Sequence, residues 1–524
     1  MRDFCKRLPA LCIALCLMFL PIGCHDPLAE AQNPPSAAAT ITVMEGNSAS
    51  NQNLSQATAD PTATPMPVQD STGYNDYSIV AEVDPETRTV TGVEKVIFKN
   101  RTGMALDQVY FNLYLNAFTR TATYQPYFDA AASVIFPAGK DYGYINITNA
   151  MINNKGAVFN TKETVLTVFF PEPLQPNAEA EITLIFDAYV PAINYRTGAN
   201  DAAMWMGNFF PILALYDENG WHKGPYYPAG DPFYANIANY HVKVTTPLGY
   251  TVVGTGEEVS VESNDIKTTD ITATLVRDFA FVIGREYKVD TLKTQSGGYV
   301  NLYHFTETEN TGDLLNVAVR WLDAYSTHIG SYPYTSLDIV EVGALPIAGG
   351  ISYPGIAFVD ATYFHSEAKQ EWLAKEIGHQ WFYNIIGSNQ VKEAWLDEGL
   401  TEYVYQSLSL SPDALAAQMA LDYATLQSEL PFIENPSLLQ DLSVYKSWQE
   451  YHSIQHIRAK LMMYALEQKI GTEAMHTFLK MYYDRFSFRL VNRAGFTTMA
   501  EEVSQMDLDE FFRGWMEDFT LPPL

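Results

Sequence analysis

The sequence is short of cysteine, of basic charge and of long apolar runs. Its four cysteines all lie within the first 24 residues, so the rest of the chain has no residues for a disulfide or a thiolate metal site. Acidic residues outnumber basic ones by 61 to 32 without a basic stripe, which argues against binding to nucleic acid. Beyond the first 20 residues no apolar run is long enough to cross a bilayer.

The first segment has the pattern of an export signal. Basic residues precede an apolar run over residues 8–19, which is too short for a mature membrane anchor. Residues 20–24 (Leu-Pro-Ile-Gly-Cys) resemble a bacterial lipoprotein box, although Pro21 stands where leucine is usual. We expect residues 1–23 to be a lipoprotein signal peptide and Cys24 to be acylated, with ordinary secretion and cleavage nearby as the alternative.

A change of composition follows this segment. Residues 24–70 are rich in Ala, Thr, Ser, Asn, Gln and Pro and contain little that a core could bury, which predicts a flexible low-complexity tether. Two or more acyl chains would anchor such a protein stably to a membrane. The expected location is therefore the extracytoplasmic face of the cell envelope, as a membrane-anchored lipoprotein.

The body of the chain divides by its hydrophobic period. Over residues 71–290 apolar and polar residues alternate between Gly, Pro, Asn and Asp turns, which predicts an antiparallel β domain. Over residues 291–524 the helical period dominates, which predicts an α-rich domain with a small sheet. The expected helices cover residues 313–329, 364–386, 395–408, most of 451–488, and 508–519, and the expected strand covers residues 337–342.

One predicted helix carries residues with a chemical pattern. Lys375 and His379 are four apart and so share a helix face. In the zinc-peptidase motif H-E-x-x-H these positions are two histidines that bind Zn²⁺, and the glutamate after the first is the general base. Glu376 stands at the base position and His379 at the second ligand position, but Lys375 replaces the first histidine. Taken alone, these residues are also compatible with a coincidental polar helix face.

The surroundings of this motif give it a context. Glu398, on the next predicted helix, stands where glutamate-zincin peptidases carry their third metal ligand. The run over residues 378–403 resembles the aminopeptidase N family of zinc metallopeptidases. Shorter stretches at residues 77–100, 330–334 and 507–515 resemble it in the same order. The resemblance implies a multidomain fold, with an N-terminal antiparallel β saddle-like domain followed by an α-rich thermolysin-like (α+β) catalytic-type domain. It also implies zinc as the family's cofactor.

The first departure from the family lies at the metal. A lysine ammonium about 4 Å from Zn²⁺ is repelled by roughly 8 kcal/mol at an effective dielectric constant near 20. Neutralising the lysine at neutral pH instead costs roughly 5 kcal/mol. Since only His379 and Glu398 remain as ligand positions, we expect zinc to be absent or weakly bound.

The second departure lies where the resemblance places the peptide substrate. The family carries a glutamate within a Gly-x-Met-Glu pattern that binds the free α-amine of the substrate. The corresponding run here is Gly349-Gly350-Ile351-Ser352-Tyr353, so serine replaces that glutamate. The resemblance assigns Gly349, Gly350, Ser352 and Tyr353 to an edge that binds substrate, without the charge that selects an N-terminus.

The third departure concerns the tyrosine whose hydroxyl stabilises the oxyanion in the family. The resemblance places His456 at that position, with an uncertainty of a residue or two. An ordinary helix-surface histidine is the alternative for His456.

These departures favour a catalytically inactive homologue of the zinc aminopeptidases. Its expected roles are peptide or protein binding, or service as an envelope scaffold, with peptides, envelope proteins and the membrane as partners and without nucleic acid. The alternative is an active metallopeptidase whose metal is held by His379, Glu398 and His456. We further expect the ammonium of Lys375 to occupy the metal region and pair with Glu398, because buried carboxylates need a compensating cation.

Overall fold

The computed structural model describes residues 74–305, 311–343, 345, 349–360 and 367–524. The expected signal peptide, tether and Cys24 lie outside these residues. Among the described residues no helix is both long and apolar enough to cross a membrane.

The first part of the described chain is built of strands, because its apolar residues recur at every second position. In β1 (Asn75–Asp84), for example, Ile79, Ala81 and Val83 are buried while the residues between them face outward. The other strands are β2 (Thr89–Lys99), β3 (Leu106–Asn112), β4 (Tyr144–Ile152), β5 (Lys155–Gly156), β6 (Phe159–Lys162), β7 (Val165–Leu174), β8 (Glu179–Tyr189), β9 (Thr197–Ala199), β10 (Ala203–Gly207), β11 (Ile212–Leu213), β12 (Tyr216–Asp217), β13 (Gly220–Trp221), β14 (Ala238–Pro247), β15 (Tyr250–Gly254), β16 (Glu257–Ser263), β17 (Ile266–Val276) and β18 (Ala280–Arg285).

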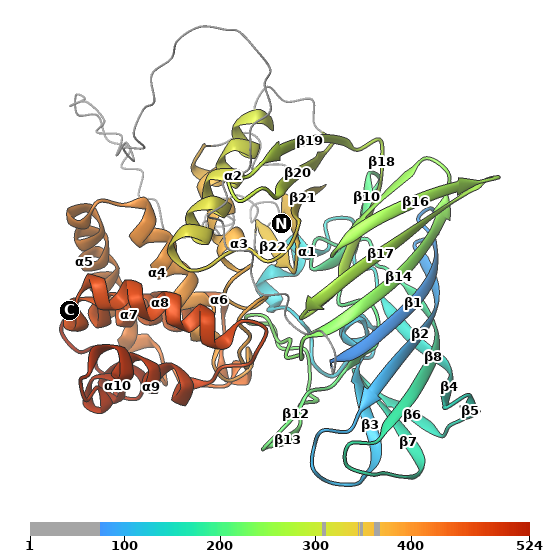
Figure 1. Cartoon of the computed structure of the whole chain (residues 1–524), viewed down its shortest axis with the longest axis horizontal. Coiled ribbons are helices and arrows are strands. Elements are labelled where there is room, and N and C mark those ends of the chain that lie inside the picture. The colour runs from blue at the N-terminus through green and yellow to red at the C-terminus, as the bar shows by residue number, and fades with distance from the viewer. Residues whose placement is uncertain (1–73, 306–310, 344, 346–348, 361–366) are drawn as a thin grey trace, which may run out of the picture. The chain divides into compact units, whose positions relative to one another are not determined.

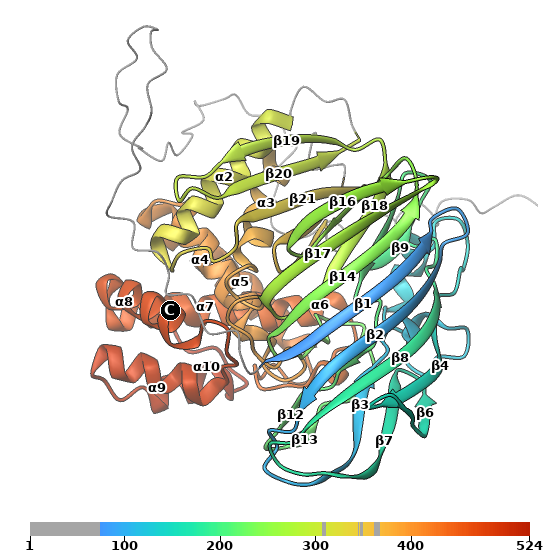
Figure 2. The ribbon, with the colours of Figure 1, turned by 45° about the vertical axis from the view of Figure 1, so that its right-hand side comes forward.

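These strands form one large sheet and smaller ones. The large sheet has the order β16-β17-β14-β1-β2-β8-β4-β5, and its strands lie side by side in Figures 1 and 2. All its neighbours are antiparallel except β1 and β14, which run parallel with Ile79 opposite Val242. Two four-stranded sheets have the orders β15-β18-β10-β9 and β11-β3-β7-β6, and β12 and β13 pair separately. This β-rich part confirms the first half of the predicted fold class.

The second part combines a five-stranded sheet with helices. Its strands are β19 (Lys288–Lys293), β20 (Tyr299–His304), β21 (Ser336–Gly343), β22 (Gly350–Tyr353) and β23 (Ile356–Asp360), in the order β19-β20-β21-β23-β22. Its helices are α2 (Thr311–His328), α3 (Glu367–Gly378), α4 (Glu398–Ser409), α5 (Pro412–Glu429), α6 (Trp448–Tyr451), the π-helix η7 (His452–Arg458), α7 (Ala459–Ile470), α8 (Thr472–Phe486), α9 (Arg493–Ser504) and α10 (Asp509–Met516). The helix-rich second part confirms the remainder of the predicted fold class.

One predicted helix is longer than the observed one. We predicted helix over residues 364–386, but α3 ends at Gly378 and the chain then turns. Within this turn Tyr383 has a left-handed φ of 92°. The buried guanidinium of Arg277 donates to the carbonyl oxygens of Tyr383, Asn384 and Ile385 in this turn, at 2.8–3.3 Å.

Arg277 joins segments that are distant in the sequence. Besides the turn after α3, its guanidinium donates to the carbonyl oxygens of Ala235 at 2.9 Å and Arg489 at 3.0 Å. The side chain follows β17 and is almost fully buried. The buried guanidinium and the buried carbonyl groups satisfy each other's hydrogen bonds. Removing the arginine would leave these carbonyl groups without a donor.

Replacing Arg277 by Met should therefore lower the free energy of unfolding by about 3 kcal/mol or more, since several buried carbonyl groups lose their donor. Urea denaturation followed by tryptophan fluorescence measures this loss. The control is Arg485→Met, which removes an exposed ion pair with Glu502 and should leave the denaturation midpoint unchanged. Equal midpoints for the two variants would contradict the role given to Arg277.

Candidate functional site

Helix α3 presents a polar face to α4. Leu373, Ala374 and Ile377 are wholly buried in the core. Residues three and four apart lie on one side of a helix, so these apolar side chains leave Lys375 and His379 on the opposite side.

Two glycines allow the helices around the site to approach closely. A Cβ atom on Gly378 would lie 2.9 Å from Cγ2 of Thr401 on α4. A Cβ atom on Gly399 would lie 2.2 Å from the Cβ of Ala459 on α7. Since real Cβ atoms do not come so near, glycine is required where α4 packs between its neighbours, and this packing fixes the position of Glu398.

The sequence-predicted residues His379 and Glu398 do come together. Nε2 of His379 lies 3.9 Å from Oε2 of Glu398. Nδ1 of the same imidazole is 2.7 Å from Oδ1 of Asp397, which orients the ring. Burial opposes the charged imidazolium, but the carboxylate of Asp397 outweighs it and raises the pKa of His379.

Lys375 pairs with a different carboxylate from the one we predicted. Its Nζ donates to Oε1 of Glu402 at 2.8 Å, so the predicted pairing with Glu398 is wrong. Glu402 lies one turn beyond Glu398 on the same face of α4 and is buried. Glu398 instead accepts a hydrogen bond from the hydroxyl of Tyr451 at 3.0 Å.

Both partners of this ion pair are charged. Burial opposes the ammonium, yet Glu402 raises the pKa of Lys375. Burial likewise opposes the carboxylate, yet Lys375, followed by Lys460, holds the pKa of Glu402 well below its usual range. Glu376, at the general-base position, has its pKa raised chiefly by burial.

The π-helix η7 brings two further groups to the site. Nε2 of His456 lies 3.6 Å from Oε2 of Glu398, and its Nδ1 lies 3.9 Å from Oε1 of Glu402. The ring of His452 stacks on that of His456 with centroids 4.8 Å apart. Burial first, and then His456, lowers the pKa of His452 to about 3, and burial also lowers the pKa of His456.

Tyr451, Glu402 and His452 are site residues that the sequence analysis did not single out. Tyr451 precedes η7, and its buried hydroxyl reaches Glu398 although our prediction put His456 at the family's tyrosine position. A π-helix contains more residues per turn than an α-helix, so side chains on either side of it are not related by α-helical spacing. The sequence does contain a tyrosine, Tyr451, five positions before His456, and this residue could have indicated the hydroxyl group of the site.

The predicted substrate edge separates into two groups. Gly350 and Ser352 lie beside α3: a Cβ on Gly350 would lie 2.8 Å from Cγ of Glu376, and the Ser352 hydroxyl donates to the Glu376 carbonyl oxygen at 2.5 Å. Tyr353 is buried and its hydroxyl donates to Oδ1 of Asn208 at 3.0 Å, which takes it to the β-rich part. Gly349 precedes β22 with a φ of 71°.

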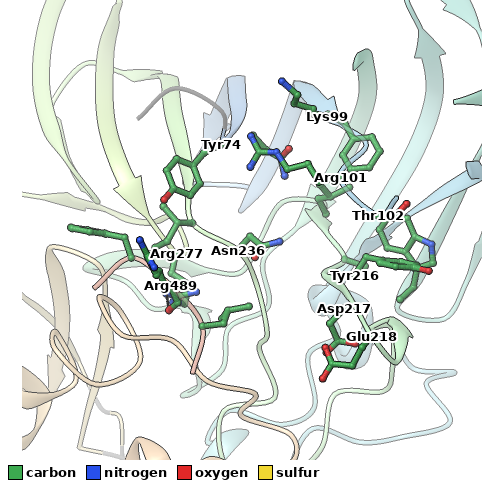
Figure 3. A pocket seen from close by; sticks show the side chains of 18 of the residues that line it. Tyr74, Lys99, Arg101, Thr102, Tyr216, Asp217, Glu218, Asn236, Arg277 and Arg489 are labelled. Atoms are coloured by element: carbon green, nitrogen blue, oxygen red, sulfur yellow. Dashed lines mark hydrogen bonds between the residues drawn. The ribbon is translucent and has the colours of Figure 1, made fainter. Parts of the chain in front are cut away.

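The cavities near and far from the site differ in size. A cavity of about 20 Å³, lined in part by Arg196, Gly230, Ile351 and Trp448, borders β22. A cavity of about 640 Å³ opens elsewhere, between the β-rich part and the segment after α8, as Figure 3 shows. None of the residues that the sequence analysis proposed for the site lines the larger cavity.

The donor set at the family's metal position does not fit zinc. A catalytic zinc ion takes three protein ligands whose donor atoms lie about 3.3 Å from one another. His379 and Glu398 approach this arrangement, but the third position carries the ammonium of Lys375, which has no lone pair to donate while it is protonated. The site therefore offers two of the three ligands.

The chain resembles known proteins over both of its parts. Residues 314–515 match the Peptidase family M1 domain. The puromycin-sensitive aminopeptidase of Caenorhabditis elegans is 24% identical over 271 residues, covering 47% of this chain and 27% of that protein. The aminopeptidase N of Lactococcus lactis subsp. lactis is 25% identical over 252 residues, covering 43% and 29%. The chain thus spans about a third or less of these curated relatives.

A solved structure extends the similarity to the whole fold. The M1 zinc metallopeptidase from Deinococcus radiodurans superposes with a TM-score of 0.63 at 18% identity, covering 86% of this chain and 95% of that one. Another structure of that protein, a mutant, is bound to a Tyr-Ser-Ala substrate. With the aminopeptidase relatives and this common fold, the family match leads to one conclusion: residues 314–515 resemble the domain of peptidase family M1, the family of the aminopeptidase N zinc metallopeptidases.

Proposed function

We propose that this chain is a catalytically inactive member of its family that binds peptides or extended protein segments. The observation that carries the proposal is the ion pair between Lys375 and Glu402, 2.8 Å long, at the place of the first metal ligand. An ammonium there removes a ligand and adds a positive charge where the family holds a dication. Without an activated water, Glu376 has nothing to deprotonate at that position.

The strand β22 supports a binding role. It is the edge of the five-stranded sheet and hydrogen-bonds only to β23 within it, with Ser352 opposite Ala357. An extended peptide can add to such an edge through its main chain without any catalytic group. A cavity of about 20 Å³ borders this strand. If no peptide binds, the remaining role is that of an envelope scaffold without a ligand.

One observation favours the alternative, an active metallopeptidase. The imidazoles of His379 and His456 both lie within 4 Å of Oε2 of Glu398, at 3.9 and 3.6 Å. A metal held by these three residues would leave a water near Glu376. An active metallopeptidase would show turnover that a chelator abolishes, whereas the inactive protein would show none.

The full chain should release no amino acid from fluorogenic amino-acid amides or short peptides, with or without added Zn²⁺. The variant Lys375→His should restore zinc at the family's position but not full activity, because Ser352 cannot bind the substrate's α-amine. Lys375→Met, which removes the charge without supplying a ligand, is the matched control and should stay inactive. Chelator-sensitive turnover by the wild-type chain would refute the proposal and support the alternative.

Lys375→Ala should lower the free energy of unfolding by about 2 kcal/mol, which is within the range for a hydrogen bond between charged groups. The effect is no larger because the Lys375 side chain is 28% exposed, so water screens the ion pair. The pKa of Glu402 is depressed, so its contribution is present above the unfolded value near 4.3 and is lost as the pH falls. The pKa of Lys375 is raised, so its contribution is present below about 10.4 and is lost as the pH rises through the folded value.

The stability difference between wild type and Lys375→Ala should thus be largest between about pH 5 and 10 and shrink in acid. Thermal melts from about pH 3 to about pH 10 measure it. The control is Lys446→Ala, which removes an exposed pair with Glu434 and should not change the melting temperature. A difference that is constant down to pH 3 would mean that the pair is not its source.

We also propose that the protein is exported and anchored through acylated Cys24, on the strength of the lipoprotein-box resemblance. Replacing Cys24 by Ala should move the protein from the membrane fraction to the soluble fraction or the medium, because no acyl chain can then be attached. Immunoblots of fractionated cells of a bacterial expression host measure this. Unchanged membrane association would place the anchor elsewhere, for instance in an uncleaved signal.

A further inference from the structure

Three donor groups lie together one turn along α4 from the family's metal position. They are the carboxylate of Glu402 and the imidazoles of His452 and His456, each offering one atom within 4.8 Å of the others. Two nitrogens and one oxygen are a usual ligand set for zinc. Donors around one zinc ion lie about 3.3 Å apart, so small side-chain rotations close this cluster around an ion.

The local backbone explains why the two imidazoles face the same way. His452 and His456 begin and nearly end the π-helix η7, where a turn takes more than four residues. Side chains four apart are therefore almost directly above one another, and the rings stack with 29° between their planes. The π-helix thus presents a pair of imidazoles to Glu402 on α4.

His456 lacks a partner that its burial requires. Both of its ring nitrogens are inaccessible to solvent, and neither makes a hydrogen bond with any described residue. The nearest carboxylate oxygens, at 3.6 and 3.9 Å, are too far for a hydrogen bond. A buried imidazole left in this state costs free energy that a ligand would recover.

We propose that Glu402, His452 and His456 bind a divalent transition-metal ion of the Zn²⁺ class, at a site displaced from the family's zinc position. Neither His379 nor Glu398 is a ligand of this site. The ion joins η7 to α4 and so stabilises the fold around the cleft. The site extends beyond the proposed function, since metal binding here needs neither catalysis nor a bound peptide.

Lys375 limits the affinity of this site. Its ammonium occupies one oxygen of Glu402 at 2.8 Å, so a metal ion competes with it for the same carboxylate. The ring of Trp372 lies 5.6 Å from Nζ and offers the displaced ammonium a second contact. Removing the ammonium should therefore strengthen metal binding, which is the reverse of what a ligand's removal does.

The test is calorimetric titration of the chelator-treated protein with Zn²⁺, after alkylation of any free cysteine so that no thiolate competes. Wild type should bind one ion with saturation, and its melting temperature should rise with Zn²⁺. His452→Ala and His456→Ala should each weaken binding at least about tenfold. Lys375→Ala should strengthen it by about tenfold or more, as a repelling charge is removed.

Two control variants separate this site from others. His476→Ala alters another pair of neighbouring imidazoles, His328 and His476, with centroids 6.3 Å apart, and should leave the affinity unchanged. His379→Ala should not weaken it, since His379 is not a ligand of this site. Thermal melts without metal show that each variant is folded, and Co²⁺ absorption reports loss of imidazole ligands independently of affinity.

Three results would overturn the proposal. The first is a wild-type chain that binds no Zn²⁺. The second is binding that His379→Ala abolishes, since the ion would then occupy the family's position. The third is binding that survives both His452→Ala and His456→Ala in folded protein.

Discussion

Buried negative charge must be balanced, and this constraint organises the cleft of the molecule. Glu376, Asp397, Glu398 and Glu402 are brought together by the close packing of α3, α4 and α7. In a zinc peptidase a dication offsets such carboxylates. Here three side chains divide the task. The ammonium of Lys375 binds Glu402, the imidazole of His379 binds Asp397, and the hydroxyl of Tyr451 binds Glu398. Lys375 therefore supplies part of the positive charge that these carboxylates require.

The other departures from the family also have structural uses. The hydroxyl of Ser352 ties the edge strand β22 to the end of α3 through the carbonyl oxygen of Glu376. Gly350 lets the Glu376 side chain lie directly against that strand. A residue that no longer binds an amine thus helps to hold the general-base position in place. The frame of the cleft is retained by contacts that do not depend on catalysis.

Much of the fold and part of the site followed from sequence periods and spacing. The alternation of β1 and the helical period of α2 depend on local pattern, and the four-residue spacing of Lys375 and His379 fixed their common face. The pairing of Lys375 with Glu402 rather than Glu398 did not follow, because local spacing does not say which carboxylate of α4 the ammonium reaches. The turn after α3 makes its contacts with the distant Arg277, and the position of Tyr451 depends on the register of a π-helix. Each of these is set by tertiary contacts that a local pattern does not contain.

The side chain of Arg277 has a consequence for how the protein reaches its native state. Its acceptors lie 42 residues before it and 106 to 212 residues after it. Contacts of such sequence separation give a high contact order, and loop-closure entropy makes them form late in folding. The turn that follows His379 shares the guanidinium of Arg277 with the carbonyl oxygen of Arg489. We therefore expect the region around this turn to be among the last to become ordered.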